Sequence, residues 1–529
     1  MPRCLVALSL LLPSLLPSLL PSLLPSLLPS LLGAQSSRRP AADTTSVTPA
    51  AARATTEGFK PAGVVTTRGT VRLASGQSLA YTATTGEMPI RNPQTDSTEG
   101  TIFFVYYQRD GAGDPEKRPL TIVFNGGPGS STVWLHMGAY GPKRVKKLDD
   151  GSSGPPPYTY EDNPYTLLDQ TDLVFLDPVG TGYSRPARPT DGPKFWGLDE
   201  DVRATGEFIR LFLTRYERWG SPKFVSGESY GTTRAAHLSG WLVDNGIALN
   251  GVALISTVLN FELSRTDRGN DIAYAGYFPS HAFTGWYHRK LDADLQRLTA
   301  AQFQAAVDKF TADEYVPWLM KGDGALTPAE RDGMYGKLAR WTGLSREFIA
   351  ANDGRIPLPR AQAALLAGER KIHGRLDSRF TAYNTDPGAG TPSFDPSESN
   401  IRNSYTPVMN DYARRHLGWK DERTYWILGG GIGPWRYEQG RFPNVVPSLE
   451  RAFVKNPDMK LYVALGYYDM ATPYWAVQYT LDHMSVDPKI RAGIRKGYFT
   501  AGHMMYIDEP SMKGMRADLR TFIESAVPR

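Results

Sequence analysis

The run Gly227-Glu228-Ser229-Tyr230-Gly231 places a serine between two glycines, in the pattern G-x-S-x-G. A serine in this pattern, between a strand and a helix, lies on a sharp turn that exposes its hydroxyl oxygen at the head of the helix. The helix dipole and the free N–H groups there favour a developing negative charge. The pattern therefore predicts that Ser229 is a nucleophile; the alternative interpretation is a glycine-lined turn between a strand and a helix.

A serine nucleophile needs a base, and the base needs an acid that orients it. Where a G-x-S-x-G turn carries the nucleophile, the acid and then the histidine follow it along the chain, on loops after strands. Asp469 ends the strand-like run LYVALGYYD, and His503 follows the run GYFT near the C-terminus. We therefore predict a triad of Ser229, Asp469 and His503. The competing candidates are interpreted as helix or turn residues: His237, His483, Asp482 and Asp487.

A glycine-rich run, NGGPGSS at residues 125–131, follows the apolar run LTIVF. Glycines let backbone N–H groups point into a cleft, as the stabilisation of an oxyanion requires. The alternatives are an ordinary turn or a phosphate-binding loop. The run contains neither G-K-[ST] nor G-x-G-x-x-G, which argues against the phosphate loop. We expect no metal and no cofactor, since H-E-x-x-H is also absent from the sequence.

The segments around these motifs alternate between strand-like and helix-like patterns, which predicts an α/β sheet with helices on both faces. Runs that are apolar throughout suit strands buried on both faces of a parallel sheet. The helix-like segments place apolar residues on one face. The strand-like runs are 64–73, 78–86, 100–108, 119–127, 171–180, 221–229 and 251–260, and the helix-like runs are 202–216 and 232–246.

This alternation stops near residue 261 and resumes after residue 405. The residues between read as several short helices over 293–373 and a loop-like stretch at 384–400. We expect an α/β core in two parts, 62–260 and 406–529, interrupted by a helical cap insertion at 261–405. The second part of the core is expected to hold strands at 424–431, 460–466 and 497–504 and helices at 474–484 and 511–526.

The N-terminus is strongly apolar over residues 5–32, where LLPS occurs five times. Its regularly spaced prolines each remove a helix donor, which disfavours a membrane-spanning helix. We expect a signal peptide at 1–34, cleaved near Ala34, a flexible linker at 35–61 and a secreted or periplasmic protein without stable membrane insertion. A retained membrane anchor is the alternative.

Composition excludes several classes of protein. Of 529 residues, 41% are hydrophobic, which is enough for a sizeable core. The net charge is +5 and no basic block is present, so no nucleic-acid partner is expected. Cys4 is the single cysteine, which excludes a disulfide framework and a cysteine-ligated metal.

Five runs in order, FNGGPGSS, DNPYTLLDQTDLVFLDPVGTGYSRP, SGESYG, GYYDMATP and AGHMMY, resemble the serine carboxypeptidase family. The resemblance extends over about residues 62–526. It implies an α/β-hydrolase fold with a mostly parallel central sheet and a helical cap. The lack of disulfides indicates a bacterial-type member of that family.

The resemblance also implies roles for single residues. Ser229 matches the nucleophile, His503 the base and Asp469 the orienting acid. The backbone N–H groups of Gly127 and Tyr230 match the oxyanion hole. The implied activity is release of C-terminal residues from peptides through an acyl-enzyme. The alternatives are an esterase or acyltransferase that uses the same triad, or a catalytically silent envelope binding protein.

Asn125 and Glu228 match the residues that bind the terminal carboxylate of the substrate. A carboxyl group can donate a hydrogen bond to a carboxylate only while it is protonated, which predicts a preference for acidic pH. The sequence departs from the family at Ser130, where a cysteine is frequent, and at Ala139, where an acid is frequent. Arg234, one helical turn after the serine, is expected to pack rather than to face the cleft. The partners implied are peptides with a free C-terminus, and no oligomeric state is predicted.

Overall fold

The computed structural model describes residues 63–527. The signal peptide expected at 1–34 and the flexible linker expected at 35–61 therefore lie outside the described residues. Within 63–527, no helix combines the length and the hydropathy that crossing a membrane requires.

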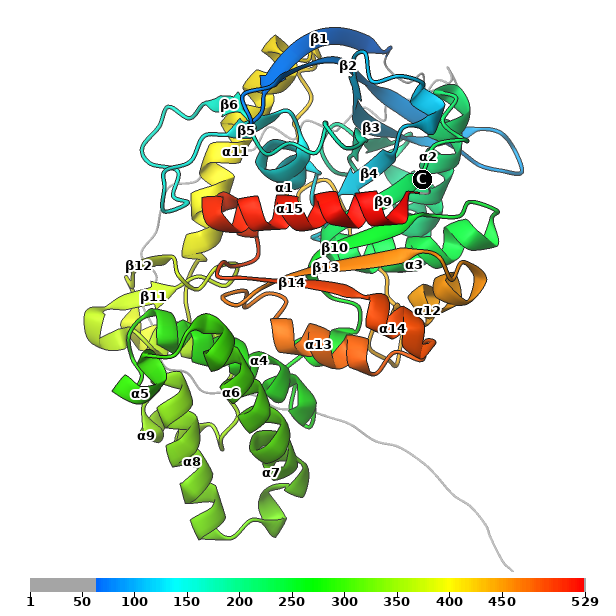
Figure 1. Cartoon of the computed structure of the whole chain (residues 1–529). Helices are drawn as coiled ribbons and strands as arrows, with labels where there is room; N and C mark the ends of the chain where they lie inside the picture. The colour runs from blue at the N-terminus through cyan, green and yellow to red at the C-terminus, as the bar shows by residue number, and fades with distance from the viewer. Residues whose placement is uncertain (1–62, 528–529) are drawn as a thin grey trace, which may run out of the picture. The chain divides into compact units, whose positions relative to one another are not determined.

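A ten-stranded sheet forms the centre of the molecule, in the order β1-β2-β3-β7-β4-β9-β10-β13-β14, with β8 paired to β3 (Figure 1). The first strands pair antiparallel, and every neighbouring pair from β7 to β14 is parallel. The mostly parallel sheet predicted from the sequence is confirmed. The strands are β1 Val65–Arg72, β2 Ser78–Arg91, β3 Thr98–Arg109, β4 Leu120–Phe124, β7 Asp172–Leu176, β8 Arg185–Pro186, β9 Lys223–Ser229, β10 Gly251–Thr257, β13 Lys460–Gly466 and β14 Arg495–Phe499.

Two hydrophobic cores cover the two faces of this sheet. Side chains alternate along a strand, so Leu254 of β10 lies in one core while Ile255 lies in the other. One core contains side chains of α2, α3, α12 and α13, and the other contains side chains of α1, α11 and α15. The helices are α1 Val133–Leu135, α2 Leu198–Arg215, α3 Tyr230–Asp244, α12 Val446–Lys455, α13 Tyr474–Asp482, α14 Pro488–Gly493 and α15 Glu509–Ala526.

The inserted segment follows β10; most of its helices form a group at one end of the molecule, whereas its last helix, α11, runs back along the sheet toward β1 (Figure 1). Apolar residues of its first helices continue the core of one sheet face, since Phe283 stacks on Tyr467 at 4.2 Å between ring centroids, while those of α11 lie in the core of the other face. Its elements are α4 Asp271–Tyr287, α5 Ala293–Gln296, α6 Ala300–Phe310, α7 Val316–Lys321, α8 Pro328–Thr342, α9 Arg346–Ala351, α10 Leu358–Ala364, β11 Lys371–His373, β12 Thr381–Tyr383 and α11 Pro396–Arg415. A separate two-stranded sheet joins β5 Lys143–Val145 to β6 Tyr160–Asp162.

Two expectations about local structure are wrong. The stretch 384–400 is not a loop to its end, because α11 begins at Pro396, with Asp395 accepting a hydrogen bond from the Ser397 N–H as its N-cap. The expected boundary at residue 405 falls within this helix. The run 424–431 forms isolated bridges instead of a strand, since Gly429 and Gly430 have φ of 67° and 78°, outside the extended region.

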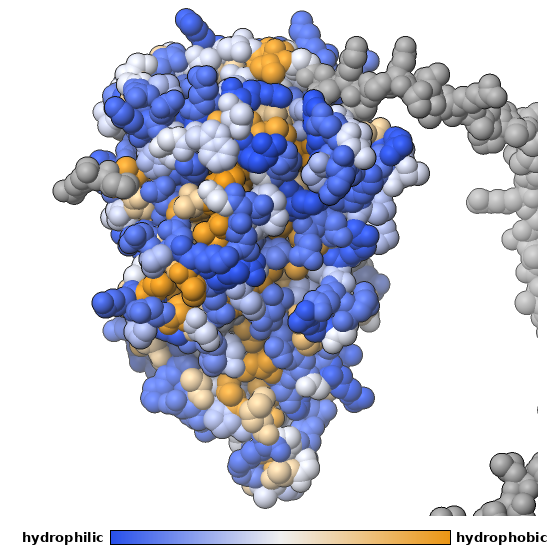
Figure 2. Space-filling view, turned by 90° about the vertical axis from the view of Figure 1, so that its right-hand side faces the viewer, coloured by the Kyte–Doolittle hydropathy of each residue, from blue (hydrophilic) through white to orange (hydrophobic). Residues whose placement is uncertain are grey.

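The surface drawn in Figure 2 is mainly hydrophilic, with apolar residues in separate patches. Most large apolar side chains of the described residues lie in the two cores. The sheet is therefore a buried platform, and the loops at the carboxyl ends of its parallel strands are free to carry functional groups.

Candidate active site

Ser229 is the last residue of β9 and the N-cap of α3, with φ 60° and ψ −130°. A non-glycine residue in such a region stores roughly 1–3 kcal/mol of strain, which surrounding packing must offset. A Cβ at Gly227 would lie 2.0 Å from the carbonyl oxygen of Gly231, and one at Gly231 would lie 3.0 Å from the backbone of Asn125. Close backbone packing therefore requires glycine at 227 and leaves little room for a side chain at 231, and the predicted sharp turn is present.

Asp469 and His503 meet through loops that follow β13 and β14. The distance from His503 Nδ1 to Asp469 Oδ2 is 2.7 Å. An ionised carboxylate only accepts hydrogen bonds, so Nδ1 carries the proton and Nε2 is left as the basic nitrogen. Asp469 is fully buried, and Oδ1 accepts hydrogen bonds from the N–H groups of Ala471 at 2.7 Å and Thr472 at 2.9 Å.

Thr472 is a site residue that the sequence analysis missed. Its hydroxyl donates to Asp469 Oδ2 at 2.6 Å and lies 3.3 Å from His503 Nδ1. The carboxylate thus receives hydrogen bonds at both oxygens, which holds it in one orientation toward the imidazole. The position of a threonine three residues after the aspartate, in the run DMAT, was the available signal.

Ser229 and His503 line the same cavity, which has a volume of about 200 Å³. Among the described residues, no hydrogen bond joins Ser229 Oγ to the imidazole. Hydrogen bonds of this kind often tighten only when a substrate is bound. The structure therefore brings the predicted serine, histidine and aspartate together at one site. In the part of the chain that the structure describes, the hydrogen bond between Ser229 Oγ and the His503 imidazole is the one contact of the triad that is not formed.

Charges around His503 favour its protonated form. Burial lowers the pKa of the imidazole, but the charge and hydrogen bond of Asp469, together with Glu228, raise it by more. Arg375 acts in the lowering direction. The net result is a pKa above the ordinary histidine value, as suits a group that accepts a proton from a serine.

The glycine run lies directly against the head of α3. A Cβ at Gly126 would lie 2.4 Å from the Tyr230 nitrogen, and Gly127 has φ 101°. As the first residue of α3, Tyr230 has no intrahelical acceptor for its N–H. The two backbone N–H groups predicted for the oxyanion hole, those of Gly127 and Tyr230, therefore lie next to the turn that carries Ser229.

Asn125 and Glu228 form a buried pair beside the nucleophile. Asn125 Nδ2 donates to Glu228 Oε1 at 3.0 Å, and both residues line the cavity. Within residues 63–527, Glu228 Oε2 makes no well-formed hydrogen bond, and the Tyr506 hydroxyl is the nearby group placed to interact with this carboxyl. Burial raises the pKa of Glu228 to about 7, against the lowering effects of the His503 charge, the Tyr506 hydroxyl and Asn125. The carboxyl is therefore neutral in mildly acidic solution and can donate a proton to an anion in the cavity.

Arg234 packs inside the core, as expected. It is fully buried, and its Nε donates to Asp201 Oδ2 at 2.7 Å while a second nitrogen donates to the Asn125 carbonyl at 2.5 Å. The arginine thereby ties α2 and α3 to the glycine run. His237 and His483 also lie away from the cavity: His237 contacts Asp199 and Ser448, and His483 contacts the Tyr479 carbonyl.

The wall of the cavity opposite the core comes from the insertion and from segment 424–431. Sequence patterns gave no sign of these residues, because the contacts join segments far apart in the chain. Arg375 has no ion pair and no side-chain hydrogen bond among residues 63–527, whereas Glu398 is paired to Arg402 at 3.0 Å. The added lining residues are Ser130, Trp134, Arg375, Leu376, Glu398, Ile401, Leu428 and Met504.

A larger cavity, of about 560 Å³, lies elsewhere, along α15. None of the predicted site residues lines it. Within the described residues, no group of three or more histidine, cysteine, aspartate or glutamate side chains is arranged to hold a metal ion. The smaller cavity is the candidate active site because it joins a strained serine, a base and backbone N–H donors.

Comparisons with known proteins find similarity to serine carboxypeptidases. The family model described as serine carboxypeptidase matches residues 90–289. Serine carboxypeptidase-like 8 of Arabidopsis thaliana is 33% identical over 131 residues, which is 24% of this chain and 29% of the relative. Serine carboxypeptidase-like 20 of the same plant is 25% identical over 200 residues, which is 31% of this chain and 39% of the relative. The matches thus span well under half of these curated relatives.

Among solved structures, Kex1Δp, a prohormone-processing carboxypeptidase from Saccharomyces cerevisiae, aligns with a TM-score of 0.48 at 15% identity. The alignment covers 83% of this chain and 91% of that one. The segment matched by the family model contains Ser229, Glu228, Asn125 and the glycine run, and ends before Asp469 and His503. By sequence, residues 90–289 are similar to serine carboxypeptidases.

Proposed function

We propose that this protein is a serine carboxypeptidase that removes C-terminal residues from peptides. The observation that carries the proposal is the Asn125–Glu228 pair, which lines the same cavity as Ser229 and His503. A general acyl hydrolase needs the nucleophile and the base, but has no need for a buried, protonated carboxyl beside them. A carboxypeptidase must recognise the terminal carboxylate, and a protonated carboxyl beside the nucleophile can donate a hydrogen bond to it.

In the proposed mechanism, Ser229 Oγ attacks the carbonyl carbon of the last peptide bond, and His503 Nε2 accepts the hydroxyl proton. The N–H groups of Gly127 and Tyr230 stabilise the resulting oxyanion. His503 then gives the proton to the leaving amino group, and the C-terminal residue departs. Water, activated by His503, hydrolyses the acyl-enzyme and regenerates Ser229, while Asp469 keeps the imidazole oriented.

Two proton requirements limit the working pH. His503 must be neutral to act as a base, and Glu228 must be protonated to donate to the substrate carboxylate. The two groups are coupled, since an ionised Glu228 raises the pKa of His503. Protonation of Glu228 therefore also favours the neutral imidazole, so both requirements are met together in mildly acidic solution.

Location and lineage are further parts of the proposal. A signal peptide cleaved near Ala34 would deliver a secreted or periplasmic enzyme, and the absence of cysteine after Cys4 is consistent with a bacterial-type member without disulfides. N-terminal sequencing of the protein recovered outside the cytoplasm tests the cleavage. A start near residue 35 supports it, and recovery of the full-length chain in membranes contradicts it.

The activity is tested with an unlabelled peptide of mixed sequence, followed by mass spectrometry. The proposal predicts successive loss of single residues from the C-terminus, and no loss with Ser229→Ala. Internal cleavage, loss from the N-terminus, or hydrolysis of esters without any peptide cleavage would overturn it. The Ser229→Ala protein is the matched control because the small change leaves the cavity walls intact.

A further inference from the structure

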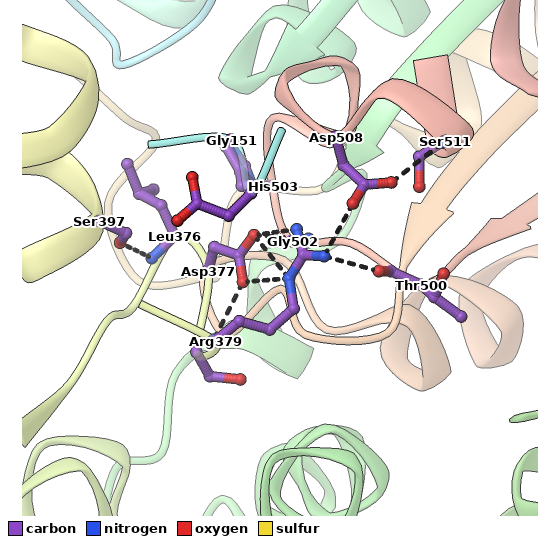
Figure 3. A network of polar contacts seen from close by, with 12 residues as sticks. Gly151, Leu376, Asp377, Arg379, Ser397, Thr500, Gly502, His503, Asp508 and Ser511 are labelled. Atoms are coloured by element: carbon purple, nitrogen blue, oxygen red, sulfur yellow. Dashed lines mark hydrogen bonds and ion pairs between the residues drawn. The ribbon is translucent and has the colours of Figure 1, made fainter. Parts of the chain in front are cut away.

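A short segment of the cap insertion lies between the two loops that carry Asp469 and His503. This cap segment, residues 375–379, connects β11 to β12. Figure 3 shows its side chains directed at the loop that carries the histidine. The contacts are specific hydrogen bonds and ion pairs, so the segment does more than cover the cavity.

On the aspartate side, the cap segment binds the backbone on both flanks of Asp469. The Ser378 N–H donates to the Tyr468 carbonyl at 3.0 Å, and the Met470 N–H donates to the Arg375 carbonyl at 3.0 Å. These two bonds fix the residues directly before and directly after the carboxylate. The loop after β13 thus takes its position partly from the insertion.

On the histidine side, the cap segment accepts two consecutive backbone N–H groups. The His503 N–H donates to the Leu376 carbonyl at 2.6 Å, and the Gly502 N–H donates to Asp377 Oδ2 at 3.1 Å. A Cβ at Gly502 would lie 2.4 Å from Asp377 Cβ, so glycine is needed there for the approach. The core holds the same loop at two carbonyls: that of Ala501 accepts from the Tyr468 N–H at 3.0 Å, and that of His503 accepts from Ser256 Oγ at 2.5 Å.

An ion pair fixes the orientation of the Asp377 carboxylate (Figure 3). Arg379 donates to both of its oxygens, at 3.0 Å from Nε and 2.7 Å from a terminal nitrogen. The same guanidinium donates to the Thr500 carbonyl at 2.9 Å and to Asp508 Oδ1 at 3.2 Å. Asp508 is the N-cap of α15 and accepts from the Ser511 N–H. The pair therefore anchors the histidine loop at Thr500 and at the start of α15.

We propose that Asp377 and Arg379 are positioning residues, which set the placement of His503 relative to Asp469 through the loop from Thr500 to His503. This inference rests on the proposed function. A displacement of about 1 Å in a catalytic group can lower the rate about 10²-fold. The two core hydrogen bonds hold the carbonyls of Ala501 and His503, whereas the Thr500 carbonyl and the Gly502 N–H bind Arg379 and Asp377, so loss of the ion pair is expected to displace the imidazole.

The test compares variants of this pair with a control pair of similar chemistry. Arg355 also donates to both oxygens of an aspartate, Asp271, at 2.8 and 2.7 Å, but it touches neither catalytic loop. The test variants are Asp377→Asn and Arg379→Gln, and the control is Arg355→Gln. Arg379→Lys keeps the positive charge, but its single ammonium nitrogen cannot reach Asp377, the Thr500 carbonyl and Asp508 together. It is the milder variant to use if Arg379→Gln does not fold.

Three quantities are measured on the full chain: kcat and KM with a peptide, the rate of labelling by a fluorophosphonate, and the pH dependence of both rates. The charged groups that act on His503 are Asp469, Glu228 and Arg375, and all three remain in every variant. A weaker Asp469–His503 contact lowers the pKa of the imidazole, so the acidic limb of the profile should move to lower pH.

We expect Asp377→Asn and Arg379→Gln to lower kcat and the labelling rate by about 10- to 100-fold with little change in KM. Arg379→Lys should lose less, and Arg355→Gln should retain wild-type rates and pH profile. Wild-type rates and pH profile in Asp377→Asn or Arg379→Lys would overturn the inference. The fluorophosphonate separates the two proposals: labelling of a wild type that cleaves no peptide C-terminus contradicts the peptidase, while the labelling rates still test the positioning role.

Discussion

Replacing Glu228 with glutamine changes one proton-dependent contact and little else in the cavity. The Glu228 carboxyl accepts from Asn125 Nδ2 at 3.0 Å, and an amide oxygen at the same place can accept that bond. The amide nitrogen can then donate to a substrate carboxylate at every pH, whereas the carboxyl can donate only while it is protonated. The variant thus removes titration and keeps hydrogen bonding.

The size of the effect follows from the pKa of about 7 that burial gives Glu228. Between about one pH unit below and one above that pKa, the protonated fraction falls about tenfold. In the wild type, kcat/KM for a free-acid peptide should therefore fall about tenfold across that interval, and in Glu228→Gln the fall should be absent. On the acidic side the Glu228 carboxyl is already uncharged in the wild type, so the acidic limb should lie at about the same pH in both proteins.

The assay measures kcat/KM for an N-blocked dipeptide, as the free acid and as the C-terminal amide, over a range from acidic to mildly alkaline pH. The amide has no terminal carboxylate and serves as the internal control, so its alkaline limb should be the same in both proteins. An alkaline fall of equal size in Glu228→Gln, or one shown by the amide as well, would refute the assignment of Glu228.

The same variant has a predicted effect on stability. The pKa of Glu228 is higher in the folded protein than the ordinary value of 4.5, so the folded state binds more protons between these pH values. The free energy of unfolding therefore falls as pH rises through that window, by at most about 3 kcal/mol, and stays lowered above it. Urea unfolding above the window should show Glu228→Gln to be more stable than the wild type, and equal midpoints there would contradict the burial argument.

Three other substitutions test the packing and charge of the site. Gly231→Ala is expected to lower the free energy of unfolding by about 1–3 kcal/mol, measured with urea, because the added methyl group would lie 3.0 Å from the Asn125 backbone; unchanged stability with full activity argues against a tightly packed turn. Arg234→Met leaves the buried carboxylate of Asp201 without its ion pair and should cost about 3–5 kcal/mol by the same measurement, and a loss below about 1 kcal/mol contradicts that role. Arg375→Glu reverses the unpaired charge in the cavity and should shift the kcat/KM ratio of glutamate- over lysine-containing dipeptides roughly tenfold toward lysine, whereas an unchanged ratio places this arginine outside the bound substrate.

The features that could be predicted from the sequence are those that depend on residue type and on neighbours close in the chain. The strained turn at Ser229 follows from two glycines whose Cβ atoms would collide with backbone, and the apolar runs at 171–180 and 251–260 became fully buried parallel strands. Asp469 and His503 could be placed because each follows a recognisable strand. These features depend on residues close together in the chain.

Features that depend on long-range contact could not be predicted in the same way. The run 424–431 reads as a strand, but glycine backbone angles and the neighbouring loops leave it with isolated bridges. The start of α11 at Pro396 was masked by a stretch rich in glycine, proline and serine, although Asp395 before a proline is a helix-start pattern. The hydrogen bond from the His503 N–H to Leu376 joins residues more than a hundred positions apart, beyond the reach of local patterns.

The central claim is that this cavity recognises the free C-terminus of a peptide beside an acylating serine. The most direct test is the ratio of kcat/KM for an N-blocked dipeptide as the free acid over its C-terminal amide, measured in mildly acidic solution beside Ser229→Ala. The account predicts a strong preference for the free acid and no turnover of either substrate by the variant. Equal turnover of acid and amide, or turnover that persists without the serine hydroxyl, would contradict it.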